Sequence, residues 1–380
     1  MSERFLSPRS LTLCLLTVIL TACAAQVEVP PTVTPIKPVE NTPTETLSPA
    51  PTKNHPPSPT PLRTPPTLPE IYLSDYLNPI DRPHTYINDT CEYLKNKWDP
   101  NNATPGTVVI IIMLNNINRG AKPNGPDSIT VSQFARMIEN LKEQGFEAIN
   151  IRQLADFLDS NKNIPPRSVV LLQDGRRTAE NFNRRFRSYW EDWGWPVVNA
   201  WIIQTDTPDT LIQENFALEQ EGFVDHQLYS ALHRFSANAS EEYLSGELKK
   251  YTDIFEGRYG KAPIAIIWPG EPGINFTKAA RELGFRLGFT SNARGPVMYN
   301  WIPLADYKDI TRPAYYPEGS FNDPLMTLPR YWPPQVHDVL DQVRLTGKDA
   351  AAYAEQNKSV ELEYYDIVCA PTYGTIPGNP

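Results

Sequence analysis

Two side chains that can bind a metal ion lie at the ends of strand-like apolar runs. Asp174 closes the run in VVLLQDGRR, and His233 ends the segment DHQLYSALH. A carboxylate and an imidazole are common ligands of zinc, which can activate a bound water. These residue types make metal chemistry one interpretation of the pair. The alternative is structural: a turn-forming Asp-Gly pair and a hydrogen-bonded histidine.

The neighbours of this pair restrict its chemistry. Gln173 precedes Asp174, and a carboxamide cannot accept a proton near neutral pH, so Gln173 is predicted to position water rather than to act as a base. Arg176 beside Asp174 can pair with it or meet a carboxylate on a sugar. His226 is not expected to join His233 on one ion, because seven strand residues at ~3.3 Å place them about 23 Å apart.

The segments that must position these residues alternate between strand and helix patterns. Residues 107–114 are a continuous apolar run, which predicts a strand buried on both faces. Residues 130–145 repeat apolar side chains at helical spacing, with Thr130 or Ser132 as the cap. The alternation predicts parallel strands with helices outside, as an open sheet or a closed barrel, with the chemistry at the carboxyl ends of the strands.

The order of these segments resembles that of the polysaccharide deacetylase family, the NodB-homology domain, from about Thr107 to Arg330. Four segments carry the resemblance: VVIIIMLNNIN is similar to the family's opening strand, LLQDG to its TFDDG motif, LHRFSAN to its SHTxSH motif and IIWPGEPG to its strand ending in YPYG. The resemblance implies an α/β fold of the distorted (β/α) barrel type. It also implies metal-dependent removal of N- or O-acetyl groups from polysaccharides.

Transferred to this sequence, the family's motifs are incomplete. Asp174 matches the metal-binding aspartate and His233 the first metal-binding histidine, whereas the second histidine falls on Ala237 and the base aspartate on Gln173. The resemblance thus implies that Asp174 and His233 hold one divalent ion, such as zinc, weakly, because two protein ligands bind zinc less tightly than three or four. A downstream Leu-x-His motif is absent from the sequence. The resemblance therefore predicts either a weakened hydrolase or a catalytically inactive protein that binds carbohydrate or serves as an envelope scaffold.

Aromatic residues near the predicted strand ends are candidates for stacking on a sugar ring. Trp268 and Phe235 are predicted to bind substrate, together with Arg176, and Tyr229 belongs to the same group. The alternative is that these aromatic side chains are part of the core, where Trp and Tyr are largely buried in most domains.

The N-terminus predicts export and lipidation. Arg4 and Arg9 precede a short apolar run that ends in LTAC at Cys23, as in a bacterial lipoprotein signal peptide. The run is too short for a span of ~20 residues. Cys23 is therefore expected to carry a lipid that anchors the protein to a membrane outside the cytoplasm, at the cell surface.

Cysteine usage and charge set two further expectations. In an exported protein Cys91 and Cys369 are a candidate disulfide, with two separate buried thiols as the alternative. The net charge of −9 argues against a nucleic-acid partner, which would require a basic face.

The expected organisation has five parts. These are a signal peptide (1–22), a Pro/Thr-rich disordered tether (23–70), an N-terminal extension (71–106), the deacetylase-like barrel (107–332) and a tail of two helices and a final extended segment (333–380).

Overall fold

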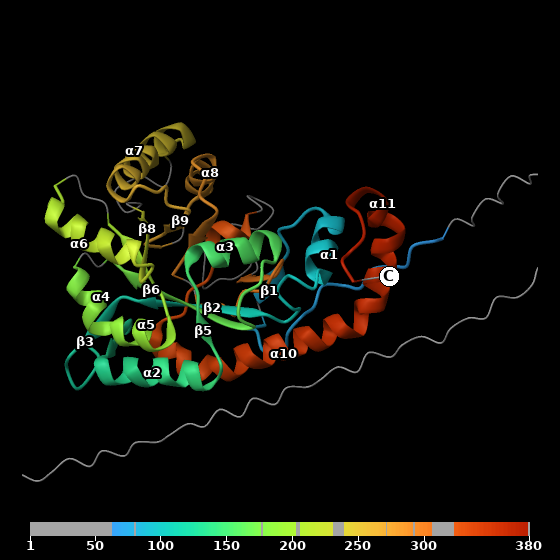
Figure 1. Ribbon diagram of the computed structural model, residues 1–380, viewed down its shortest axis with the longest axis horizontal. Coiled ribbons are helices and arrows are strands. Elements are labelled where there is room, and N and C mark those ends of the chain that lie inside the picture. Colours follow the sequence, from blue (N-terminus) through green and yellow to red (C-terminus); the bar gives the residue numbers. More distant parts are fainter. Residues whose placement is uncertain are drawn as a thin grey trace, which may run out of the picture. The chain divides into compact units, whose positions relative to one another are not determined.

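A parallel sheet of seven strands forms the centre of the described part of the chain (Figure 1). The computed structural model describes residues 63–79, 81–175, 178–202, 206–230, 239–270, 272–291, 293–305 and 323–378. The strand order is β10-β9-β8-β7-β6-β2, with β5 also beside β6. The strands of this sheet are β2 (Val108–Leu114), β5 (Glu147–Ala148), β6 (Arg167–Asp174), β7 (Val197–Trp201), β8 (Val224–Tyr229), β9 (Ala265–Ile267) and β10 (Leu287–Phe289).

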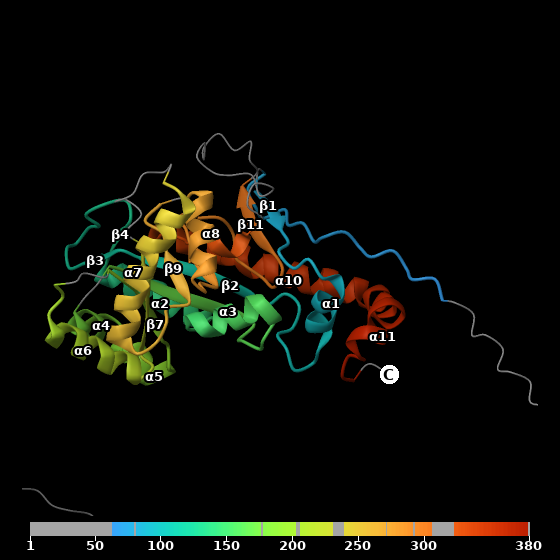
Figure 2. The same cartoon turned by 90° about the horizontal axis from the view of Figure 1, so that it is seen from above.

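Helices connect and surround these strands (Figure 2). Their bounds are α1 (Thr90–Trp98), α2 (Val131–Glu143), α3 (Ile151–Ser160), α4 (Ala179–Arg185), α5 (Arg187–Trp193), α6 (Asp209–Gln220), α7 (Glu241–Tyr259), α8 (Ile274–Glu282), α10 (Pro333–Tyr364) and α11 (Ala370–Tyr373), with the 3-10 helix η2 (Pro324–Thr327) and the π-helical turn η3 (Tyr365–Cys369). Thr130 caps α2 in a capping box with Gln133, as the sequence predicted.

The remaining strands form two small pairs. β1 (Asp81–His84) runs antiparallel to β11 (Ile302–Ala305), and β3 (Asn116–Asn118) runs parallel to β4 (Ser128–Thr130).

A four-residue segment, 328–331, links the two edges of the large sheet. Leu328 exchanges backbone hydrogen bonds with Gly288 and Thr290 at the β10 edge, at 2.8 and 2.9 Å. Tyr331 does the same with Ile111 and Met113 of β2, at 2.7 and 2.9 Å. The segment thus lies between β10 and β2 and closes the sheet on itself. The prediction of an α/β fold of the distorted (β/α) barrel type is confirmed.

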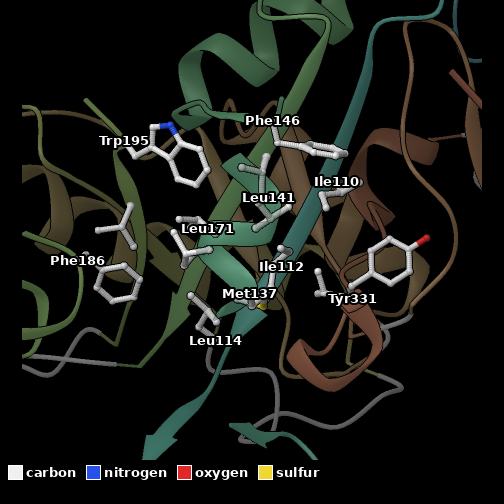
Figure 3. Close-up of a cluster of buried hydrophobic side chains, with 14 of the residues drawn as sticks. Ile110, Ile112, Leu114, Met137, Leu141, Phe146, Leu171, Phe186, Trp195 and Tyr331 are labelled. Atoms are coloured by element: carbon white, nitrogen blue, oxygen red, sulfur yellow. The ribbon is translucent and has the colours of Figure 1, made fainter. Parts of the chain in front are cut away.

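The side chains of β2 and β6 alternate between two apolar clusters, as expected for strands covered on both faces. Ile110 and Leu171 point outward, where they meet Met137 and Leu141 of α2 (Figure 3). Val170 and Leu172 point to the opposite face, in the cluster that includes residues of β7, β9 and β10. This alternation determines which side each polar residue at the strand end faces.

One expectation about helices was wrong. The tail was expected to form two helices and an extended end, but α10 is a single helix of 32 residues. Gly347 lies in the middle of α10, where a β-carbon would approach the Gly106 carbonyl to 2.8 Å. Here the glycine permits close packing of the helix on the start of β2 instead of ending the helix.

The tail packs against α1, and Cys91 and Cys369 are joined in a disulfide. Leu94 of α1, Tyr365, Cys369 and Ile376 share one buried cluster. The N-terminal extension and the tail are therefore packed together at one end of the molecule (Figures 1 and 2). Of the helices in the described ranges, none is both long and apolar enough to cross a membrane.

Candidate functional site

A cavity of about 380 Å³, here called the mouth cavity, opens at the carboxyl ends of the strands. Asp174 ends β6, Tyr229 ends β8, and Asn115 follows β2. The lining residues are Met113, Asn115, Asp174, Gly175, Ile202, Tyr229, Pro269, Ser291, Arg330 and Trp332. The strand ends therefore gather aromatic, amide, hydroxyl and charged groups at the position where such barrels place their chemistry.

Asp174 is paired with a buried cation. Its Oδ1 lies 3.1 Å from Nη1 of Arg330, and the two side chains are 15% and 1% exposed. Arg330 belongs to the segment 328–331 that closes the barrel. Because both groups are withdrawn from water, removing either one would leave the other as a buried charge without a counterion, which is strongly destabilising.

The Arg330 guanidinium also bonds two backbone carbonyls. Its Nε donates to Thr290 O at 2.7 Å and its Nη2 to Trp268 O at 3.1 Å. Thr290 follows β10 and Trp268 follows β9, while Asp174 ends β6. The planar fork of one arginine thus ties together the ends of three strands, which a point charge such as lysine could not do.

Asp174 and Arg330 both affect the pKa of Tyr229. Burial and the nearby Asp174 carboxylate raise the pKa of the Tyr229 phenol, while Arg330 acts in the opposite direction. The phenol therefore stays protonated at neutral pH and can donate a hydrogen bond into the mouth cavity. Tyr229, one of the aromatic residues expected near the strand ends, does line this cavity.

Gln173 does not face the mouth, so its predicted role in positioning water is wrong. The residue is 1% exposed, and its amide Nε2 donates to the carbonyl of Leu114, with longer contacts of 3.3 Å to Asn115 O and Asp174 O. Neighbouring residues of a strand point to opposite faces, and here Asp174 lines the cavity whereas Gln173 is buried against the end of β2. Gln173 instead secures the end of β2.

Replacing Gln173 with aspartate is expected to destabilise the protein and to restore no hydrolysis. The substitution removes a buried donor and directs a carboxylate toward carbonyl oxygens, which costs roughly 1–3 kcal/mol or more for a charged group. Urea unfolding at neutral and acidic pH measures this cost, which should shrink at acidic pH as the new carboxyl becomes protonated. Gln173→Glu is the matched variant, because it introduces the same carboxylate while keeping the length of the glutamine side chain. Acetate release by Gln173→Asp would contradict this assignment.

Trp268 is a core residue, and its predicted role in substrate binding is wrong. The side chain is fully buried, and its indole N–H donates to Met326 O at 2.9 Å. No face of the ring is open to a sugar. Among the described residues, the aromatic side chains that line the mouth cavity are those of Tyr229 and Trp332.

The described residues do not fit a divalent metal. Within the described ranges, no group of three or more His, Cys, Asp or Glu side chains is placed to hold an ion. Asp174 already bonds a cation, and His226 is buried away from the cavity, with its ring nitrogens 2.9 Å from Glu219 Oε2 and 3.2 Å from Asn215 Oδ1. His233, Phe235, Ala237, Arg176 and Cys23 lie outside the described residues.

Arg330 is the residue of this site that the sequence analysis missed. It lies 156 residues from Asp174 in the chain, and the segment that carries it pairs with each neighbouring strand through a single residue. Such a short segment shows no strand periodicity. The available signal was indirect, because a carboxylate at a buried strand end requires a positive partner.

Comparisons with known proteins identify structural relatives. No protein-family model and no curated protein matches the chain. Among solved structures, the deacetylase PplD of Streptococcus pyogenes matches with 17% identity over 63% of this chain and 99% of its own, at a TM-score of 0.48.

Two further structures match a similar share of the chain. The BpsB deacetylase domain of Bordetella bronchiseptica matches with 17% identity over 61% of this chain and 97% of its own, at a TM-score of 0.43. BC0361, a polysaccharide deacetylase of Bacillus cereus, matches with 16% identity over 59% and 64%, at 0.41. The chain thus has structural matches to several polysaccharide deacetylases over most of one domain.

Proposed function

We propose that this chain is a polysaccharide-binding protein with a deacetylase-like barrel that does not hydrolyse acetyl groups by a metal-dependent route. The observation that carries the proposal is the Asp174–Arg330 ion pair. A metal-dependent deacetylase uses the carboxylate at this position as a ligand, whereas here it bonds a buried guanidinium. An ion would have to displace Arg330 and leave that charge buried without its partner.

The mouth cavity has the features of a site for a neutral or acetylated sugar. Tyr229 and Trp332 supply aromatic surface, and Asn115, Ser291 and the Tyr229 hydroxyl supply polar groups. Ligand sites commonly combine such apolar surface with a few polar groups that fix orientation. The Asp174–Arg330 pair is neutral as a whole, so it favours neither an anionic nor a cationic glycan.

The proposal includes location at the cell surface. The signal-peptide pattern and the Pro/Thr-rich tether support attachment through a lipid on Cys23, with the barrel held outside the membrane. A glycan of the cell envelope or of the surroundings would then be within reach. Mass spectrometry of the protein from a membrane fraction checks for the lipid on Cys23, and a Cys23→Ser variant should lose it.

Metal analysis, acetate release and glycan binding together test the proposed function. Purified protein is expected to contain no stoichiometric zinc and to release no acetate from acetylated chitooligosaccharides, while binding them in isothermal titration calorimetry. Trp332→Ala should weaken binding about tenfold, equivalent to 1.4 kcal/mol, because it removes aromatic surface from the cavity. Tyr243→Ala is the matched control, since Tyr243 is an exposed aromatic residue on α7.

Two results would reject the proposal. Stoichiometric zinc with turnover that vanishes in Asp174→Ala would show a metal-dependent hydrolase. Failure of the acetylated oligosaccharides to bind would leave the mouth cavity without the proposed ligand.

A further inference from the structure

A second cavity, here called the base cavity, lies at the opposite end of the barrel and has a volume of about 320 Å³. Gly106 and Thr107 line it just before β2, whereas Met113 and Asn115 line the mouth cavity at the other end of the same strand. A strand of seven residues separates the two cavities by roughly 20 Å. A ligand in one cavity therefore cannot touch the lining of the other unless it is a long chain.

The base cavity is formed where three distant parts of the chain meet. Residues of the N-terminal extension, the turn at residues 298–301 and α10 all contribute to its lining. Figure 1 shows α1 and β1 at the end of the molecule where α10 continues toward α11, with β3 and α4 at the other end.

Five aromatic side chains supply much of its wall: Tyr72, Tyr93, Tyr299, Trp301 and Tyr353. They pack against one another in two groups. Tyr93 stacks on Tyr299 with ring centroids 5.7 Å apart, and Tyr72 contacts Trp301 and Tyr353 at 6.3 and 5.6 Å. The four tyrosines are only half-buried, so part of each ring remains open.

Hydrogen bonds fix these aromatic residues in place. Trp301 Nε1 donates to Tyr72 O at 2.9 Å, and the Tyr353 hydroxyl donates to Glu70 O at 2.6 Å. The Tyr299 hydroxyl accepts from Asn96 Nδ2 at 3.2 Å. The wall is therefore formed before any ligand arrives, which reduces the ordering cost of binding.

The buried charges of the lining form an ion pair that is neutral as a whole, while the exposed Glu70 adds one carboxylate to the lining. Lys97 Nζ lies 2.8 and 2.7 Å from the two oxygens of Glu361, and Trp98 Nε1 donates to the same carboxylate at 2.7 Å. The side chains of Lys97 and Glu361 are only 11% and 6% exposed. A charged ligand would disturb this balance, whereas a neutral ligand with hydroxyl or amide groups would not.

The hydroxyl of Tyr93 offers a further hydrogen bond. Its ring lies under Lys97 Nζ at 5.5 Å, and in the described part of the chain its hydroxyl has no hydrogen-bond partner. Burial and the nearby Glu361 raise the pKa of Tyr93, so the hydroxyl remains protonated and can donate. Thr85 and Thr90, which are exposed, line the entrance with two more hydroxyl groups.

We infer that the base cavity is a second binding site for a neutral pyranose unit of a glycan. Preformed aromatic walls, a neutral polar pair and several hydroxyl groups match a ring that has apolar faces and a polar rim. The volume lies at the lower end of the range for small-ligand pockets, roughly 300–1,000 Å³. The choice of a glycan rests on the proposed function, whereas the position of the site rests on this cavity alone.

Calorimetric titration of the full-length protein with N,N′-diacetylchitobiose tests the inference. The wild-type protein is expected to bind at two sites. Thr85→Trp places a large ring at the entrance of the base cavity and should lower the affinity of that site at least tenfold. Tyr93→Phe should lower the affinity of the same site about threefold to tenfold, because a hydrogen bond is lost. Thr210→Trp is the matched control, since Thr210 is an exposed threonine on α6.

The mouth variant Trp332→Ala separates the two proposals. Weakening of one site in Thr85→Trp and of the other in Trp332→Ala supports both. Binding that Trp332→Ala weakens and Thr85→Trp leaves unchanged overturns the base cavity but not the proposed function. Binding lost only in Thr85→Trp supports the base cavity and rejects the mouth cavity as a glycan site. If diacetylchitobiose does not bind at all, the inference is overturned.

Discussion

Replacing Arg330 with methionine is expected to lower the free energy of unfolding by about 3–5 kcal/mol, the cost typical of breaking a buried ion pair from one side. The side chain of Arg330 is 1% exposed and bonds Asp174, Thr290 O and Trp268 O. Methionine fills similar space but leaves a carboxylate and two carbonyls without this donor. Urea unfolding followed by circular dichroism measures the loss.

A double-mutant cycle isolates the contribution of the pair. Asp174→Asn keeps an oxygen that can accept from Arg330, so it should cost less than Arg330→Met. The double variant no longer contains the uncompensated carboxylate. Its loss of unfolding free energy should therefore be smaller than the sum of the losses in the two single variants by about 1–3 kcal/mol, as expected for residues in contact.

A second ion pair provides the control for this cycle. Arg281 bonds Asp323 at 2.6 Å, but the two side chains are 33% and 22% exposed. Arg281→Met should therefore cost only about 1 kcal/mol, near the upper end for a solvent-accessible pair. If Arg330→Met cost no more than Arg281→Met, the Asp174–Arg330 pair would not be the strong buried interaction on which the proposed function rests. If Arg330→Met bound stoichiometric zinc without a loss of stability, Asp174 would be able to act as a metal ligand and the proposed function would fail.

The sequence was sufficient to predict the barrel but not its closure. The apolar run of β2 and the capping box of α2 are local signals, and the structure contains both elements where they were expected. The closing segment, 328–331, has no such signal, because it is defined by its two neighbours rather than by its own pattern. Arg330 could not be assigned to the site before its segment was placed.

The two wrong site predictions have different causes. Gln173 was assigned by its position in a motif, but in this chain its side chain bonds the carbonyl of Leu114 and not the cavity. Trp268 was assigned because it follows a strand, but the strand end turns its ring toward Met326 of η2. The first depended on how the end of β2 packs against β6, and the second on where η2 packs.

The Cys91–Cys369 disulfide is expected to stabilise the protein by about 2–5 kcal/mol, the usual cost of removing a native disulfide. The bond joins residues 278 positions apart. In the chain-entropy model, closing a loop of this length raises the free energy of the unfolded chain by about 5.6 kcal/mol, and enthalpic effects reduce the net stabilisation. Few other covalent changes in this chain can have so large an effect on the unfolded state.

The double variant Cys91→Ala/Cys369→Ala measures this contribution in urea unfolding. A reducing agent should lower the stability of the wild-type protein toward that of the variant and should not change the variant itself, which is the control for other effects of the reductant. Unfolding of the double variant should begin with separation of η3 and α11 from α1, because Cys369 is buried in their shared cluster. Amide hydrogen exchange can locate this first step, since exchange in the double variant should be faster in α1, η3 and α11 than in β2 and β6.

The position of the disulfide links its removal to the base cavity. Tyr93 and Leu94 lie on α1 close to Cys91, and both line that cavity, so loosening α1 should weaken ligand binding there before the barrel unfolds. The mouth cavity is built on strand ends at the far side and should keep its affinity. Unchanged stability after reduction, or a loss of mouth binding that precedes the loss at the base cavity, would show that the disulfide does not hold this end of the molecule together.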